Sequence, residues 1–182
     1  MEKKKNIIVI MIFMSLCFIF TVGCKSVPQN IVPITNFDAQ KYLGKWYEIA
    51  RFDFLFERNM SNVTAEYVEN DDGSILVINR GYNLNQHEWK KSEGKAKFRE
   101  GVDIGALKVS FFGPFYSDYT VLAIDDSYSY ALVGGKNYDY LWILSRTPDM
   151  PYSIQQQYVD MAESIGFDTE NLVWTIHNER AL

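Results

Sequence analysis

The sequence predicts an all-β fold: an eight-stranded antiparallel up-and-down barrel, with a C-terminal α-helix packed outside it and a short final strand. Three observations lead to this prediction. Short runs rich in Val, Ile, Tyr, Phe and Trp recur along the chain between turn clusters at fairly even intervals, which is typical of an all-β barrel or sandwich. The connections are short and suit consecutive hairpins. After residue 148 the apolar pattern changes to a helical period.

The N-terminal segment predicts export from the cytoplasm. Three lysines, Lys3 to Lys5, precede an almost unbroken apolar run over residues 7–20. A membrane-spanning helix needs about 20 apolar residues, whereas a shorter run behind a basic leader is typical of a secretory signal peptide. We therefore expect residues 1–23 to be a signal peptide, and the alternative is an N-terminal transmembrane anchor.

The end of that run, Thr21-Val22-Gly23-Cys24, resembles the lipobox of bacterial lipoproteins. In such proteins the signal is cut before the cysteine, whose thioether takes a diacylglycerol and whose amine takes a further acyl chain such as palmitate. Several acyl chains make a stable anchor, whereas one holds a protein only marginally. Cys24 is thus the expected lipid anchor, against the alternative of an ordinary small residue. Since no Asp follows it, the resemblance implies the periplasmic face of the outer membrane.

Residues 24–35 are polar and contain Pro28 and Pro33, which predicts a short lipidated linker. Residues 36–182 then form the barrel domain. The other cysteine, Cys17, lies in the signal peptide. The mature chain therefore has no thiol pair for a disulfide, and burial of a core must hold the domain together.

Eight strands are expected, and Gly, Asn and Asp residues between them suit turns because these residues tolerate a positive φ. The predicted strands are residues 44–52, 61–69, 74–82, 88–98, 105–112, 117–124, 130–134 and 140–145. A closed barrel of eight strands leaves no exposed sheet edge, and its interior is just wide enough for one small ligand.

The helix and the last strand follow Pro148. Four apolar side chains, Ile154, Tyr158, Met161 and Ile165, fall on one helical face, and Gly166 is placed to end the helix. A final strand is expected at residues 171–176.

Three blocks of the sequence resemble the signature blocks of the lipocalin family. The first comprises residues 36–38 and the run Tyr42-Leu43-Gly44-Lys45-Trp46-Tyr47-Glu48, the second residues 116–119 followed by Asp125 and Tyr128, and the third residues 141–146. The three occur in the family's order, with a helix after the third. Residues 44–52, 108–116 and 140–146 are closest to the bacterial outer-membrane members, which are lipoproteins.

This resemblance implies a protein that binds fatty acids or lysophospholipids, for storage or transport in envelope maintenance under stress. It also implies a homodimer. In the family, the tryptophan matching Trp46 closes the barrel floor beside the glycine matching Gly44, and the arginine matching Arg146 lies across its ring. Such a cation–π contact contributes about 0.5 to 2 kcal/mol.

Candidates for the ligand site follow from strand period. If Arg146 lies at the floor, then Trp142 and Tyr140 share the inward face of the last long strand with Leu144. Trp142 is the first candidate for a pocket wall. Size and strand position add four further candidates, Tyr67, Phe98, Phe111 and Tyr119. The alternative for each of them is ordinary packing.

Charge and missing motifs exclude other functions. Without residues 1–23 the chain keeps 15 basic and 22 acidic residues, a net charge of −7, and has no Lys/Arg-rich block, which disfavours nucleic acid as a partner. His87 and His177 lie in no metal-binding spacing, and no nucleophile elbow or phosphate-binding loop occurs. We expect no catalytic residue, metal or cofactor. The remaining alternatives are an interaction or scaffold lipoprotein and a lipid-modifying enzyme.

Overall fold

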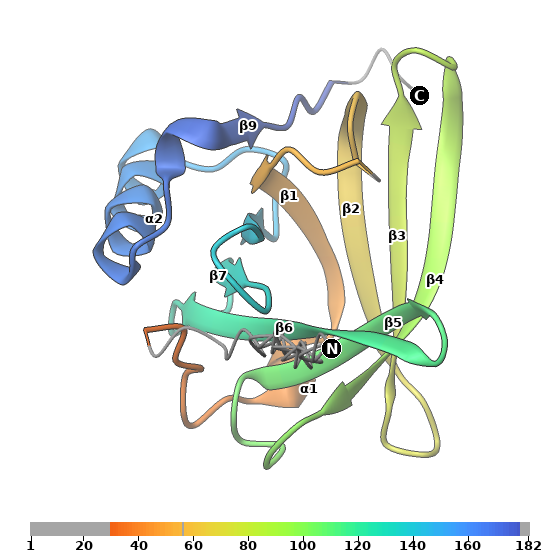
Figure 1. The fold of residues 1–182 in the computed structure, drawn as a ribbon, viewed down its shortest axis with the longest axis vertical. Coiled ribbons are helices and arrows are strands. Elements are labelled where there is room, and N and C mark those ends of the chain that lie inside the picture. The colour runs from red at the N-terminus through yellow and green to blue at the C-terminus, as the bar shows by residue number, and fades with distance from the viewer. Residues whose placement is uncertain (1–29, 56, 179–182) are drawn as a thin grey trace, which may run out of the picture.

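The computed structural model describes residues 30–55 and 57–178 (Figure 1). The predicted signal peptide and Cys24 lie outside the described residues. Residues 30–35, which the sequence assigns to the linker, pack against the barrel: Ile31 is buried, and Thr35 forms a bridge with Ile104.

Nine strands and three helical segments make up the described chain. They are α1 (Ala39–Tyr42), β1 (Gly44–Phe52), β2 (Met60–Glu69), β3 (Ile75–Asn83), β4 (Glu88–Phe98), β5 (Ala106–Phe112), β6 (Phe115–Ile124), β7 (Tyr130–Gly134), β8 (Leu141–Ser145), α2 (Tyr152–Ile165), the 3₁₀ turn η1 (Thr169–Asn171) and β9 (Leu172–Trp174).

The strands form one closed antiparallel barrel. Each of β2 to β8 pairs with its neighbour in sequence, and β1 closes the ring by pairing with both β8 and β2. The predicted meander is therefore confirmed. Strands β1, β4 and β7 have the expected bounds, and the others differ by one or two residues at their ends. The final strand is shorter than expected: residue 171 belongs to the 3₁₀ turn, and the strand ends at Trp174.

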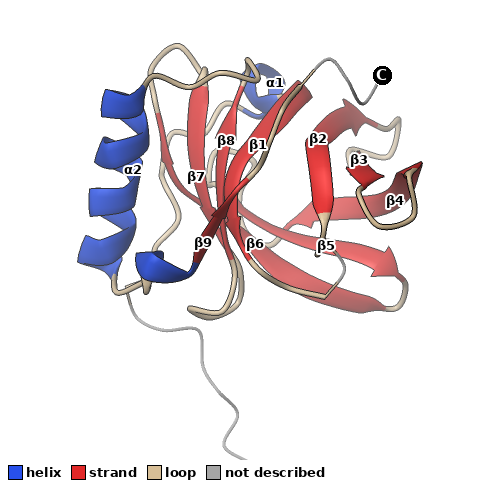
Figure 2. Cartoon of the chain, turned by 90° about the horizontal axis from the view of Figure 1, so that it is seen from above, coloured by secondary structure: helices blue, strands red, loops and turns tan. Residues whose placement is uncertain are grey.

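Alternation along the strands creates two apolar clusters. The inner cluster lies inside the barrel and includes Trp46, Tyr67 and Leu144. The outer cluster lies between the barrel and α2 and includes Leu141 and Ile143. Each fully buried leucine or isoleucine contributes about 1.5 to 3 kcal/mol. Figure 2 shows α2 beside β7 and β8, on the outside of the barrel.

The predicted face of α2 packs on the outer cluster. Tyr158 is buried there, and Ile154, Met161 and Ile165 are partly buried against it. Gly166 has a φ of 112°, and its N–H donates to carbonyls of the last helical turn. A left-handed glycine of this kind is the usual helix stop. Among the described residues, no helix is both long and apolar enough to cross a bilayer.

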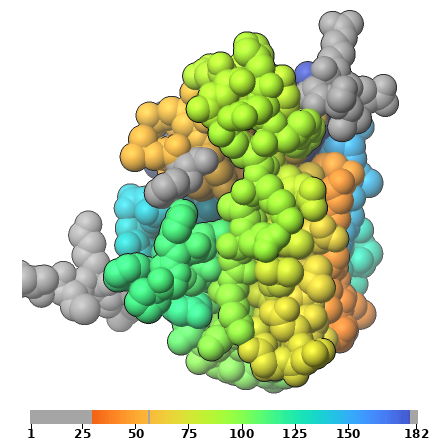
Figure 3. All heavy atoms as spheres, turned by 90° about the vertical axis from the view of Figure 1, so that its right-hand side faces the viewer, coloured from red at the N-terminus to blue at the C-terminus, as the bar shows by residue number. Residues whose placement is uncertain are grey.

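The two ends of the barrel differ. At the closed end lie α1 and the turns β2–β3, β4–β5 and β6–β7, whereas the loops β1–β2, β3–β4, β5–β6 and β7–β8 surround the open end. The first part of β4, residues 88–93, is exposed and pairs only with β3. Figure 3 shows this β3–β4 hairpin standing above the rest of the barrel.

The C-terminal segment, which comprises β9 and residues 175–178, fills a gap between β1 and β2. These strands pair only where Gly44 to Tyr47 lie opposite Tyr67 to Thr64. Further towards the open end, β9 pairs with β1, and the N–H of Asn62 on β2 donates to the carbonyl of Ile176. Figure 1 shows the chain passing from β9 towards β2. The C-terminal segment is therefore part of the barrel wall.

Candidate ligand-binding site

The closed end is sealed by Trp46, whose side chain is wholly buried. Its Nε1 donates to the carbonyl of Tyr42 at 2.8 Å, which ties the ring to α1. The Arg146 guanidinium lies 3.9 Å from the centre of the Trp46 ring, a cation–π contact. These side chains form a solid floor.

Arg146 also holds three segments of that floor together. Its guanidinium donates to the carbonyls of Lys45 at 2.9 Å, Lys41 at 2.6 Å and Tyr128 at 3.2 Å. Gly44 has a φ of 89° and lies against Arg146, so the backbone can turn into β1 there without steric cost. The structure thus brings Gly44, Trp46 and Arg146 together.

Tyr42, Tyr67 and Tyr119 form what we call the tyrosine triad, and its Tyr42 ring lies 5.0 Å from the centre of the Trp46 ring. The Tyr119 hydroxyl oxygen is 2.6 Å from that of Tyr42 and 2.7 Å from that of Tyr67. Burial raises the pKa of all three phenols, that of Tyr67 to about 12. The triad is therefore uncharged at neutral pH, and its hydroxyl groups both donate and accept hydrogen bonds among themselves.

Stacked aromatic rings continue from the triad to the open end. Trp142 stacks on Tyr119 with ring centres 6.4 Å apart, and Tyr140 stacks on Trp142 at 6.2 Å. Phe54, from the β1–β2 loop, meets Trp142 edge-on at 5.3 Å. Tyr140 lies just before β8 rather than inside the predicted strand. These rings form one series, which we call the aromatic column: Tyr140, Trp142, Tyr119, Tyr67, Tyr42 and Trp46.

The remaining candidates flank this column. Phe98 and Phe111 are partly buried against the inner cluster. Phe98 lies 6.4 Å from Phe37 near the floor, and Phe111 packs over Gly94, where any Cβ would come within 2.8 Å of its ring. Six aromatic residues chosen from the sequence thus line the interior or its mouth.

A cleft of about 580 Å³ opens beside the mouth, between the first part of β6 and the β7–β8 loop. Its lining residues are Tyr116, Ser117, Asp118, Lys136, Asn137, Asp139 and Tyr140. Tyr140 belongs both to this cleft and to the aromatic column, so the cleft lies beside the outer end of that column.

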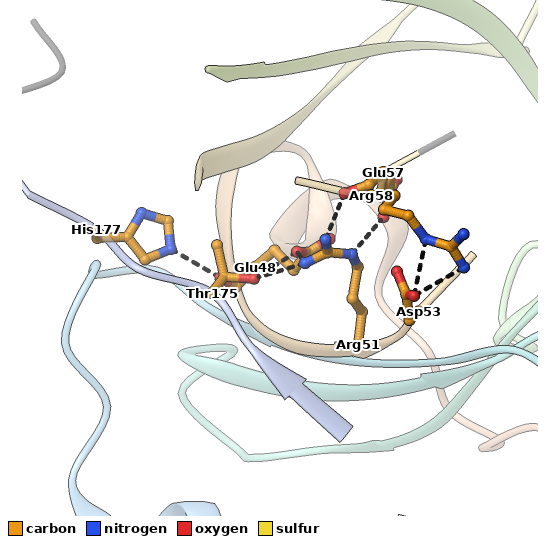
Figure 4. A network of polar contacts seen from close by, with 7 residues as sticks. All are labelled: Glu48, Arg51, Asp53, Glu57, Arg58, Thr175 and His177. Carbon is orange, nitrogen blue, oxygen red and sulfur yellow. Dashed lines mark hydrogen bonds and ion pairs between the residues drawn. The ribbon is translucent and has the colours of Figure 1, made fainter. Parts of the chain in front are cut away.

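The structure also shows a buried ionic network that the sequence did not predict (Figure 4). Arg51 is only 1% exposed and donates to the carboxylate of Glu48 at 2.9 Å, to the Thr175 hydroxyl at 3.2 Å and to the carbonyl of Glu57. Burial, and after it the charge of Glu48, raises the pKa of the Glu57 carboxyl. The Nε2–H of His177 donates to the carbonyl of Glu48 at 2.7 Å. This network fastens the C-terminal segment to β1.

A bulge explains why this network escaped prediction. The register of β1 against β8 shifts between Glu48 and Ala50. Strict alternation from Trp46 would turn Arg51 outwards, but Ala50 and Phe52 belong to the outer cluster, so Arg51 faces the interior beside Glu48. Within residues 30–55 and 57–178, no group of His, Cys, Asp and Glu side chains is arranged to hold a metal ion.

Comparison with known proteins agrees with this geometry. Residues 37–177 match the model of the lipocalin-like domain family. The chain is 49% identical to the outer membrane lipoprotein Blc of Vibrio cholerae over 90% of this chain and 96% of that protein. It is 52% identical to the Citrobacter freundii protein of the same name, over 84% of this chain and 88% of that one. These relatives support the predicted location at the outer membrane.

A solved structure supports the fold independently. Insecticyanin from the tobacco hornworm superposes with a TM-score of 0.66 at 20% identity, covering 82% of this chain and 86% of that one. Lipocalins bind ligands rather than transform them, which agrees with the prediction that the chain is not an enzyme. The family match, the identity to these relatives and the closed barrel together show that this chain belongs to the lipocalin family.

Proposed function

We propose that this protein is a lipid-anchored lipocalin of the outer membrane whose barrel binds one fatty acid or lysophospholipid. The observation that carries the proposal is the aromatic column, which runs from the cleft at the mouth to the floor at Trp46. An apolar interior closed at one end and open at the other suits a single-chain lipid.

Burial of the alkyl chain would supply the affinity. Each methylene transferred from water into the interior contributes about 0.8 kcal/mol. A long acyl chain therefore reaches micromolar affinity even after the cost of its immobilisation. Trp142, Tyr140, Tyr119, Tyr67, Phe98 and Phe111 are the residues proposed to contact it.

Cys24 is the proposed anchor, carrying diacylglycerol and a further acyl chain such as palmitate on the periplasmic face. The relatives named outer membrane lipoproteins support this assignment, as does the lipobox-like sequence before Cys24. The proposed role is to store or transport lipid during envelope stress. Membrane fractionation of wild-type and Cys24→Ala cells tests the anchor, since only the wild-type protein should partition with the outer membrane.

The family resemblance also implies a homodimer. Analytical ultracentrifugation of the mature Cys24→Ala chain tests this, since the account predicts a sedimentation coefficient of two chains, and a monomer at all concentrations would contradict it.

Lipid binding is tested with the mature chain carrying Cys24→Ala, so that no attached acyl chain competes for the barrel. Titration with palmitate and with a lysophospholipid, followed by native mass spectrometry, should give saturable complexes of one lipid per chain. Absence of saturable binding for both lipids would refute the proposal and favour a scaffold role.

A further inference from the structure

We propose that the open end of the barrel docks on the surface of a phospholipid bilayer, into which three of its loops insert exposed apolar side chains. We call these side chains the apolar rim: Leu55, Leu84, Trp89 and Phe115. The inference rests on the proposed function for the anchor at Cys24. It goes beyond that function because it states which surface of the barrel meets the membrane.

The rim places large apolar side chains at the tips of three separate loops. Leu55 in the β1–β2 loop is 77% exposed, Leu84 at the start of the β3–β4 loop 47%, and Phe115 at the tip of the β5–β6 hairpin 79%. By contrast, the three turns of the closed end, all within the described chain, expose only Val102 among their large apolar residues. Apolar side chains gathered at one end mark an interaction site, whereas scattered ones need no explanation.

Basic side chains accompany the rim. They follow Leu55 and Trp89 in the sequence or lie beside the β5–β6 tip: Arg58, Lys90, Lys91 and Lys108. The Lys108 ammonium lies 5.4 Å from the centre of the Tyr116 ring. The other three are each paired with a carboxylate, so this surface carries little net charge. Aromatic residues beside lysine and arginine are typical of protein surfaces at a membrane interface, where the long basic side chains reach the headgroups.

The closed end, in contrast, is acidic. Its three turns carry six carboxylates, at residues 71, 72, 100, 103, 125 and 126, and one basic residue, Arg99. The Arg99 guanidinium is itself paired at 3.0 Å with Asp118. A bilayer that contains anionic lipid repels such a surface and accepts the nearly neutral rim. Charge therefore favours the open end as the surface that meets the membrane.

The length of the tether requires the barrel to lie close to the bilayer. The described chain begins at Asn30, six residues after Cys24, and six residues span at most about 22 Å. Ile31 is buried in the outer cluster, so the chain is fixed to the barrel from that point on. A barrel anchored through Cys24 cannot be held far from the membrane, and one of its surfaces must face the bilayer at close range.

The shape of the rim favours a fluid partner over a second copy of the chain. The β3–β4 hairpin, which carries Leu84 and Trp89, stands above the rest of the barrel in Figure 3. The β5–β6 hairpin projects separately, and both hairpins lie on the side away from α2 (Figure 1). Stable protein interfaces are packed as densely as protein interiors, and a second folded surface would leave gaps between such projections. A fluid lipid layer closes around them.

The aromatic pair on the β3–β4 hairpin suits the same partner. Trp89 is half-exposed and meets Tyr82 edge-on, with ring centres 5.7 Å apart. Rings of this kind bury an apolar face and keep a polar tip wet, which suits the boundary between headgroups and acyl chains. With the rim in this layer, the mouth of the barrel faces the bilayer, and a lipid can enter or leave without crossing water.

The orientation is tested on vesicles of three parts phosphatidylethanolamine to one part phosphatidylglycerol. The mature Cys24→Ala chain is held there through an N-terminal histidine tag and a nickel-chelating lipid. This chain has no cysteine, so Leu84→Cys, Phe115→Cys and Val102→Cys each carry a single environment-sensitive fluorophore. We expect the emission to shift to shorter wavelength at the two rim positions and to stay as in water at Val102→Cys. No shift at either rim position, or an equal shift at Val102→Cys, would overturn the inference.

The same labelled chains without vesicles test a second copy as the partner. A shift at the rim positions that appears in solution and grows with protein concentration would assign the rim to self-association and overturn the inference. Because the tag replaces the acyl anchor, neither result depends on acylation of Cys24. Failure of the docking surface is therefore distinct from failure of the anchor or of lipid binding, which are measured by fractionation and by titration.

The contribution of the rim side chains is tested by adding Leu55→Ser and Phe115→Ser to the chain labelled at Leu84→Cys. Removal of two large apolar contacts should lower the ratio of inserted to free label by at least about tenfold. The matched control adds Val68→Ser and Val102→Ser, which remove two exposed apolar side chains away from the rim, and it should leave the ratio unchanged. Equal ratios for the rim variant and the control would overturn the inference.

Discussion

Arg146 is the residue whose loss should damage the closed end most. It donates to three backbone carbonyls and lies over Trp46. Arg146→Ala should lower the free energy of unfolding by about 2 kcal/mol, since it removes charged hydrogen bonds and a cation–π contact. Urea denaturation measures this loss. Arg80→Ala, which removes an exposed arginine, is the control, and an equal effect of both changes would contradict the structure.

The tyrosine triad should make the protein sensitive to high pH. The folded pKa of Tyr67, about 12, exceeds the ordinary value of 10.0. In the interval between these values the unfolded chain releases a proton that the folded chain keeps. Stability is therefore fully present below pH 10 and falls as the pH rises towards 12.

Urea midpoints measured from pH 8 to pH 11.5 check this prediction. The wild-type midpoint should fall more steeply above pH 10 than that of the triple variant Tyr42→Phe, Tyr67→Phe, Tyr119→Phe. Parallel curves for the two proteins would show that the triad is not protected from ionisation.

At the scale of single elements, the C-terminal segment depends on Thr175. Its hydroxyl accepts from Arg51 and donates to Glu48 at 2.6 Å. Thr175→Val should cost about 1 to 3 kcal/mol of stability, because it leaves buried charged groups without a hydrogen-bond partner. Chemical denaturation measures this loss. Thr169→Val, which removes an exposed hydroxyl bonded to Glu163, is the control for a general effect of replacing threonine by valine. A loss no larger than that of the control would contradict the proposed fastening.

Alternation and turn chemistry were enough to predict the strands, because both depend on neighbouring residues. The short helix α1 was not predicted: four residues show no helical period, although Asp38, which caps it by accepting from the N–H groups of Gln40 and Lys41, is a typical N-cap residue. For the same reason Tyr42 was missing from the candidate site. The bulge in β1 hid Arg51, since its register is set by β8, far along the chain.

At the scale of the whole molecule, membrane attachment and ligand binding are separate tasks. The proposed anchor at Cys24 precedes Ile31, which belongs to the outer cluster between the barrel and α2. The aromatic column lies inside the barrel. Changes to the anchor should therefore alter where the protein resides and leave lipid affinity unchanged.

The most direct test of the central claim compares two tryptophans. Trp142 lies in the aromatic column, whereas Trp174 on β9 is 42% exposed. Palmitate affinity is measured by native mass spectrometry for Trp142→Ala and Trp174→Ala in the mature Cys24→Ala chain. The account predicts at least a tenfold loss for Trp142→Ala, since a large apolar contact area disappears, and little change for Trp174→Ala. Undiminished binding by Trp142→Ala would contradict the claim that the lipid lies inside the barrel.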